Sequence, residues 1–134
     1  METMKEKVVM ITGAAAGIGL ACAEAFAKAG ATTILVDINK PEPQTRKLTD
    51  EGFKAVAYGC DVSDTQAVKE MVDWIVATYG HLDAALNNAG IQTPQRPMAE
   101  ITDEEFDRTV AVDLKGVWNC MRYEIIQMLK QGGG

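Results

Sequence analysis

The stretch Thr12-Gly13-Ala14-Ala15-Ala16-Gly17-Ile18-Gly19 follows a short apolar run and leads into a segment with helical periodicity. The apolar run, 7–11 (KVVMI), is rich in β-branched residues and predicts a strand, whereas 15–30 predicts a helix. Glycines in the connecting turn allow a tight reversal, close approach of a ligand to the backbone and close packing of helix on strand. This strand–turn–helix unit indicates an α/β fold and marks the turn as a candidate ligand site.

The same alternation of strand and helix continues along the rest of the chain. Further strands are expected at 32–37, 53–58 and 82–87, and further helices at 41–51, about 63–79 and 103–129, the last bent near Gly116. Ser63 with Gln66, and Thr102 with Glu105, have the spacing of capping boxes. Such alternation produces parallel strands joined by right-handed crossovers. We predict one domain over 1–134, a doubly wound parallel sheet of four strands in the order 3-2-1-4 with helices on both faces.

Composition and charge exclude several classes of protein. Hydrophobic residues make up 47% and charged residues 24% of the 134 residues, which suits a globular domain and not a disordered chain. The net charge of −6 argues against a nucleic-acid partner, because phosphate binding needs clustered positive charge. No apolar stretch approaches the ~18 residues of a membrane span, and the charged start does not resemble a signal peptide. We therefore expect a cytoplasmic protein.

Cysteine and histidine usage offers no metal site. Cys22, Cys60 and Cys120 are far apart, and no two of them form a CxxC pair. His81 is the single histidine and follows a Tyr-Gly turn. We expect three reduced cysteines in or near apolar packing, a surface histidine and no bound metal.

The glycine-rich turn has the context that a dinucleotide needs. The start of the helix offers free N–H groups and a positive dipole end to a pyrophosphate. Asp37 ends the second expected strand, where a carboxylate can accept hydrogen bonds from ribose hydroxyls and repel a 2′-phosphate. Neither the turn nor positions 38 and 39 carry Arg or Lys. The pattern predicts a dinucleotide site that prefers NAD to NADP.

The motif TGxxxGIG at 12–19 resembles the cofactor turn of the short-chain dehydrogenase/reductase family. Asp61-Val62, the segment 87–90 (NNAG) and the segment 110–116 (VAVDLKG) resemble further family motifs. The resemblance implies a Rossmann-like fold in which Asn87 braces the sheet. It also implies that the cofactor is lined by Gly13, Ala16, Gly17, Ile18, Gly19, Asp37, Ile38, Asp61, Val62, Asn88, Ala89, Gly90 and Val112.

The sequence departs from the family pattern in two ways. Asp113 stands where the family usually has an Asn of a proton relay; an Asp keeps an acceptor but loses the amide donor, and it is the candidate catalytic residue. The family's catalytic Ser, and its Tyr and Lys in a YxxxK arrangement, would follow the long helix, and Tyr58, Tyr79 and Tyr123 are not followed by Lys at the fourth position. We expect a truncated, cofactor-binding half that is inactive alone.

Three functions remain open from the sequence. The resemblance implies an NAD(H)-dependent oxidoreductase acting on an alcohol or ketone. A free-standing NAD-binding module without catalysis is the second. An assembling fragment is the third, because the open edge of strand 82–87 and the helix 103–129 could both pair with another copy. That helix carries an apolar stripe of Val110, Leu114, Val117, Met121, Ile125 and Met128, and we expect a homo-oligomer.

Overall fold

The four strands of the computed structural model, which describes residues 3–134, form one sheet in the order β3-β2-β1-β4. Their bounds are Val8–Thr12 for β1, Thr32–Asp37 for β2, Ala55–Gly59 for β3 and Ala84–Leu86 for β4. All three neighbouring pairs are parallel, and β1 lies between β2 and β4. The predicted strand order is confirmed, although β3 starts later and β4 is shorter than expected.

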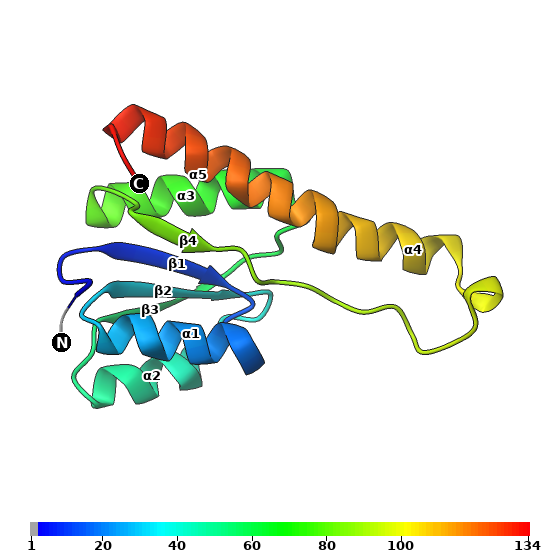
Figure 1. The fold of residues 1–134 in the computed structure, drawn as a ribbon, viewed down its shortest axis with the longest axis horizontal. Helices are drawn as coiled ribbons and strands as arrows, with labels where there is room; N and C mark the ends of the chain where they lie inside the picture. Colours follow the sequence, from blue (N-terminus) through cyan, green and yellow to red (C-terminus); the bar gives the residue numbers. More distant parts are fainter. Residues whose placement is uncertain (1–2) are drawn as a thin grey trace.

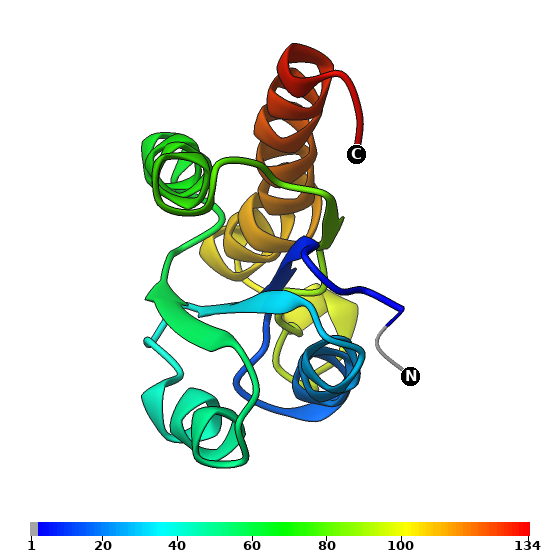
Figure 2. The same ribbon diagram turned by 90° about the vertical axis from the view of Figure 1, so that its left-hand side faces the viewer.

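Helices cover both faces of this sheet, as the sequence predicts. Figure 2 shows α1 (Gly17–Lys28) and α2 (Glu42–Asp50) on one face, and α3 (Thr65–Tyr79) and α5 (Val117–Gln131) on the other. The short helix α4 (Asp103–Thr109) continues into α5 through 110–116 and extends beyond the carboxyl ends of the strands (Figure 1). A one-turn 3-10 helix, Met98–Glu100, precedes α4. Among residues 3–134, the helices lack the combination of length and apolarity that crossing a bilayer requires.

The core consists of two apolar layers, one on each face of the sheet. Successive side chains of a strand point to opposite faces, so Met10 of β1 belongs to the same layer as Ile75 of α3, whereas Ile11 belongs to the layer of Ala23 of α1. All five residues of β1 are buried. Burial on both faces explains why the strands are apolar without a polar alternation.

The start of α3 differs from the prediction. Asp64, and not Ser63, caps the helix, because its carboxylate accepts the Ala67 N–H at 3.1 Å. The Ser63 hydroxyl instead donates to Asp61 at 2.7 Å, so the capping box predicted at Ser63 is wrong. The box at Thr102 and Glu105 is present, with both reciprocal hydrogen bonds formed.

The long C-terminal helix contains a local change of helical type. Residues Val110–Gly116 form a π-helical segment, where a bend near Gly116 was expected, and α5 continues to Gln131. Gly116 is buried, and a Cβ there would lie 2.6 Å from a methyl carbon of Val62. The glycine therefore lets this segment approach the loop after β3. Single turns of π-helix often occur at functional sites.

Candidate cofactor-binding site

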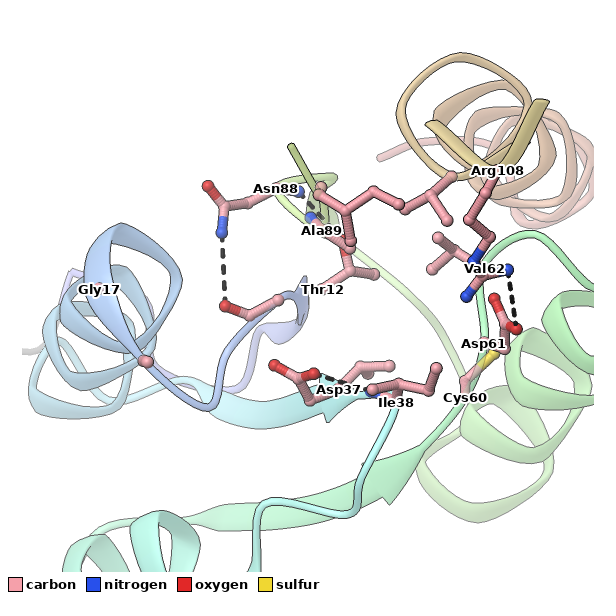
Figure 3. A pocket seen from close by; sticks show the side chains of 16 residues that line it. Thr12, Gly17, Asp37, Ile38, Cys60, Asp61, Val62, Asn88, Ala89 and Arg108 are labelled. Carbon is pink, nitrogen blue, oxygen red and sulfur yellow. Dashed lines mark hydrogen bonds and ion pairs between the residues drawn. The ribbon is translucent and has the colours of Figure 1, made fainter. Parts of the chain in front are cut away.

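A hollow of about 350 Å³ opens at the carboxyl ends of the strands, where β1 is flanked by β2 and β4 (Figure 3). Its size falls in the range of small-molecule sites, and its place is the switch point at which α/β sheets bind ligands. The lining comes from the turn after β1, the ends of β2, β3 and β4, and the C-terminal helices. It consists of Thr12, Gly13, Ala16, Gly17, Val36, Asp37, Ile38, Cys60, Asp61, Val62, Asn88, Ala89, Gly90, Ile91, Arg108 and Val112.

The glycine-rich turn presents bare backbone to this hollow. Gly13 and Gly17 have φ of 65° and 57°, in the left-handed region that glycine adopts without strain. A Cβ on Gly17 would meet nothing within 4 Å, so the space beside it is open. Helix α1 has no side-chain cap at Ala16 among the described residues and no acidic residue in its first turn. Its first N–H groups are thus left for an anion.

Thr12 joins the turn to the loop after β4. Its hydroxyl oxygen accepts the backbone N–H groups of Asn88 and Ala89, each at 3.0 Å. The Asn88 side-chain amide donates to the Gly13 carbonyl at 3.4 Å. A Cβ on Gly13 would lie 2.9 Å from the Ala89 Cα, so the two segments are in close contact. Motifs more than 70 residues apart in the sequence therefore form one wall.

Asp37 places a half-buried carboxylate at the end of β2. Its Oδ2 accepts the Ala15 N–H at 3.0 Å, and its Oδ1 accepts the Ile38 N–H at 2.8 Å. These two bonds fix the side chain against the turn and leave further lone pairs for a ligand, since each carboxylate oxygen has about two. A diol such as a ribose is the natural partner for such a carboxylate.

Asp61 and Arg108 form the far end of the hollow. Asp61 Oδ1 accepts the Ser63 N–H at 3.0 Å and the Ser63 hydroxyl at 2.7 Å, while Oδ2 faces Arg108 Nη1 at 3.5 Å. Arg108 Nη1 also donates to the Ser63 hydroxyl oxygen at 3.0 Å. Burial alone would raise the pKa of the Asp61 carboxyl, but the Ser63 hydrogen bonds and the Arg108 charge outweigh it and lower that pKa. Asp61 is thus held ionised.

Three of the residues predicted for the site lie outside the lining. The Ile18 side chain is 74% exposed, on a part of α1 that does not face the hollow. Gly19 is buried beneath the turn, where a Cβ would lie 2.1 Å from the Gly13 carbonyl oxygen, so its role is packing. Asp113 lies in the π-helical segment, and its Oδ1 accepts the Ile91 N–H at 2.8 Å. All the other predicted residues line the hollow.

The sequence reasoning missed five lining residues: Thr12, Val36, Cys60, Ile91 and Arg108. Four of them adjoin residues that were predicted: Thr12 is the first residue of the motif 12–19 itself, and Val36, Cys60 and Ile91 are one position away from Asp37, Asp61 and Gly90. Arg108 belongs to no motif, and only the folding of α4 brings it to the hollow. Cys60 is buried; this burial raises the pKa of its thiol to about 11, so it does not act as a thiolate nucleophile near neutral pH.

The lining fits a nicotinamide dinucleotide. Open space beside the Gly17 backbone suits a pyrophosphate, the fixed carboxylate of Asp37 suits a ribose, and the slot between Ile38 and Asp61 has apolar and polar walls that suit a base. Across residues 3–134, no cluster of three or more His, Cys, Asp or Glu side chains is arranged to hold a metal ion.

Comparison with known proteins identifies the family. The model of a family described as short chain dehydrogenase matches residues 7–134. An uncharacterized oxidoreductase, YxbG, from Bacillus subtilis (strain 168) is 41% identical over 135 residues, covering 99% of this chain and 50% of that protein. The chain therefore belongs to the short-chain dehydrogenase family.

Solved structures agree with this family and fold. A short-chain type dehydrogenase/reductase from Mycobacterium marinum superposes with a TM-score of 0.93 and 31% identity, covering 98% of this chain and 53% of that one. A metagenomic short-chain oxidoreductase in complex with NADP superposes with a TM-score of 0.91 and 28% identity, covering 98% of this chain and 61% of that one. An NAD⁺-bound xylitol dehydrogenase superposes with a TM-score of 0.88 and 31% identity, covering 98% of this chain and 51% of that one. The chain thus spans about half the length of the relatives it matches.

Proposed function

We propose that this chain is the cofactor-binding part of an NAD(H)-dependent oxidoreductase acting on an alcohol or ketone, with 1–134 as one domain in the cytoplasm. The observation that carries the proposal is the Asp37 carboxylate, fixed by two backbone N–H groups beside the uncapped start of α1. A carboxylate acceptor for a diol next to free donors for a diphosphate matches the adenosine half of NAD. The more general assignment, that the chain is part of an oxidoreductase, rests on the match to the short-chain dehydrogenase family.

Each wall of the hollow has one task in this proposal. The N–H groups at the start of α1 bind the pyrophosphate, and Asp37 binds the adenosine ribose. The loop 88–90 and Val112 also line the hollow, and we assign them to the nicotinamide half of the cofactor. The chemistry that a bound NAD would supply in the full enzyme is hydride acceptance, and these residues of the chain would supply binding and orientation.

The preference for NAD over NADP rests on charge. A 2′-phosphate on the ribose would lie against the Asp37 carboxylate, and two negative charges in contact repel each other. Lys40, which follows positions 38 and 39 in sequence, pairs with Glu42 at 3.4 Å, and Arg108 in the lining pairs with Asp61 at 3.5 Å. The structural relatives include both an NADP and an NAD⁺ complex, so the support comes from this chain's own residues.

Isothermal titration calorimetry on the 134-residue chain tests the cofactor assignment. We expect NAD to bind more tightly than NADP, and Asp37→Ala to lose roughly tenfold or more in NAD affinity, as expected for a charge-assisted hydrogen bond. Glu42→Ala, which removes an exposed carboxylate on α2, is the matched control and should bind NAD as wild type does. Equal NAD affinity in wild type and Asp37→Ala would refute the role of Asp37.

Catalysis requires more than this cofactor site supplies. None of the three tyrosines has a lysine four residues later, and Asp113 replaces the usual Asn of the relay. We therefore propose that the 134-residue polypeptide binds the dinucleotide but does not turn it over, and that Asp113 supports the relay only as an acceptor. Robust reduction of NAD with simple secondary alcohols by the purified chain would contradict this.

An assembling role is the second candidate, and exposed apolar residues favour it. Along the C-terminal helices, Leu114, Trp118, Met121, Ile125 and Leu129 are 46–78% exposed. Contiguous exposed apolar side chains usually mark an interface. We propose a homo-oligomer formed through these helices or through the open edge of β4. A strictly monomeric mass by light scattering at high micromolar concentration would contradict the proposal.

A further inference from the structure

Helix α5 holds the segment around β4 at both of its ends (Figure 1). Before the strand, the Gln131 side chain donates to the Leu82 carbonyl at 2.7 Å and accepts the Leu82 N–H at 3.1 Å. After the strand, Glu124 Oε2 accepts from Asn87 Nδ2 at 2.8 Å. Within the described chain, β4 is half-buried and pairs on one side only, with β1. The side chains of α5 therefore help to fix where the loop after β4 begins.

Glu124 carries a carboxyl group into the apolar interior. The residue is only 5% exposed. Among residues 3–134, Glu124 Oε1 and Asn87 Oδ1 are both shielded from solvent and have no hydrogen-bond partner. Two buried acceptors without donors are costly, and these two belong to the groups that the 2.8 Å hydrogen bond already joins. A proton on Glu124 supplies the missing donor, because a neutral carboxyl group has an O–H.

We propose that Glu124 is a positioning residue of the cofactor site: in its protonated form it closes a second hydrogen bond to Asn87 and fixes the start of the cofactor loop 88–90. The inference rests on the proposed function. The acid and the amide then form two parallel hydrogen bonds, from Asn87 Nδ2 to Glu124 Oε2 and from the Glu124 hydroxyl at Oε1 to Asn87 Oδ1. The proton comes from solvent and returns to it on titration, and no covalent bond other than O–H changes.

The pair acts on the hollow through the residues that follow Asn87. The backbone N–H groups of Asn88 and Ala89 donate to the Thr12 hydroxyl oxygen, and both residues line the hollow. The loop is thus held by Thr12 from β1 and by Glu124 from α5. Without its proton, Glu124 would place a negative charge against the unpartnered Asn87 carbonyl oxygen in apolar surroundings. The loop would then lose one of its two anchors, and cofactor binding would weaken.

The surroundings of Glu124 offer no compensating positive charge. Burial raises the pKa of Glu124, and the Asn87 hydrogen bond opposes this only in part. Within residues 3–134, no Lys, Arg or His from α3, β1 or β4 contributes to that pKa. The titratable groups on this side are the Cys120 thiol, one turn earlier on α5, and Cys60 after β3. Burial raises their pKa values to about 12 and about 11, so both thiols are neutral. Glu124 is therefore the group of this cluster that titrates first as pH rises.

Infrared spectroscopy tests the proton directly and does not depend on a ligand. At about pH 6 an exposed glutamate is almost wholly ionised. We expect the wild type to keep, at this pH, the carbonyl stretch of a protonated carboxyl group, and Glu124→Gln to lack it. Glu104→Gln removes an exposed carboxylate from α4 and should keep this band.

Calorimetry with NAD tests the positioning role. Wild-type affinity should fall as pH rises through the folded-state pKa of Glu124, whereas Glu124→Gln, which still pairs with the Asn87 amide, should show no such fall. Glu124→Ala leaves that amide unpaired and should bind NAD roughly tenfold more weakly than wild type at about pH 6. Glutamine, which restores a neutral partner, should restore this affinity. The control Glu104→Gln should follow wild type at every pH.

The outcomes separate the inference from the proposed function. The inference is wrong if the wild type lacks the protonated-carboxyl band, or if wild type and Glu124→Gln show parallel plots of NAD affinity against pH. It is also wrong if Glu124→Ala, folded by circular dichroism, binds NAD as wild type does. If Glu124→Ala does not fold, the band and the pH plots still decide. If the wild type shows the band but binds no NAD, it is the proposed function that fails.

Discussion

Gly17 and Gly19 lie two residues apart in the same turn, and the structure assigns them different tasks. A Cβ on Gly19 would lie 2.1 Å from the Gly13 carbonyl oxygen and 2.6 Å from the Asn88 side-chain nitrogen. A Cβ on Gly17 would enter the open hollow and meet no atom of the chain. Alanine at 19 should therefore reduce stability, and alanine at 17 should reduce dinucleotide binding.

The magnitudes follow from these distances. The nearest atom to a Cβ at Gly19 belongs to rigid backbone, so the turn must move, and we expect about 3 kcal/mol of destabilisation, the upper part of the range for overpacking. At Gly17 the φ of 57° costs an alanine about 1 kcal/mol. That methyl group also occupies the space where a pyrophosphate must approach the backbone, so affinity for NAD should fall by well over tenfold.

Urea unfolding followed by circular dichroism, together with calorimetry with NAD, separates the two effects. Ala21, an exposed residue of α1, provides a control as Ala21→Ser, which should change neither quantity by much. If Gly17→Ala binds NAD like wild type, or if Gly19→Ala is no less stable than Gly17→Ala, the assignment of the turn is wrong.

Three further predictions concern buried groups. Thr12→Val leaves two backbone N–H groups of the loop after β4 without their acceptor, and should cost about 2 kcal/mol in urea unfolding. Burial raises the pKa of Glu124 in the folded state, despite an opposing hydrogen bond from Asn87. The wild type should therefore lose stability as the pH rises from below the unfolded-state pKa of this carboxyl through its higher folded-state pKa, whereas Glu124→Gln should lack this loss. Parallel plots of unfolding free energy against pH for the two proteins would contradict this. Burial also raises the thiol pKa of Cys60 to about 11 and of Cys120 to about 12, so iodoacetamide at pH 8 should label Cys22 first, as peptide mass mapping would show.

The fold was largely predictable because each element carries a local signal. The apolar run of β2 has the bounds that the sequence predicts, and the capping box at Thr102 begins α4 as expected. Local rules failed at Ser63, because its hydroxyl has a better partner in Asp61, a tertiary contact of the loop after β3. They also failed to predict the π-helical segment, which depends on how closely Gly116 packs against Val62.

The candidate site was predictable where motifs adjoin it. The turn 12–19, Asp37 and the loop 88–90 are contiguous in sequence with the strands that position them, so their meeting at one sheet edge follows from topology. Arg108 could not be predicted, since its position depends on the path of 91–102 and on the docking of α4. Ile18 shows the converse: it belongs to the motif, but its helical position turns it to solvent.

Chemical-shift mapping tests the account most directly, because it shows where on the ¹⁵N-labelled chain NAD binds. The account predicts saturable shifts of the backbone amides of 13–17, of Asp37 and Ile38, of Asp61 and of 88–90, with smaller effects elsewhere. It would be contradicted if NAD left these amides unchanged, or if the shifts clustered at the opposite end of the sheet, around His81 and Gln131.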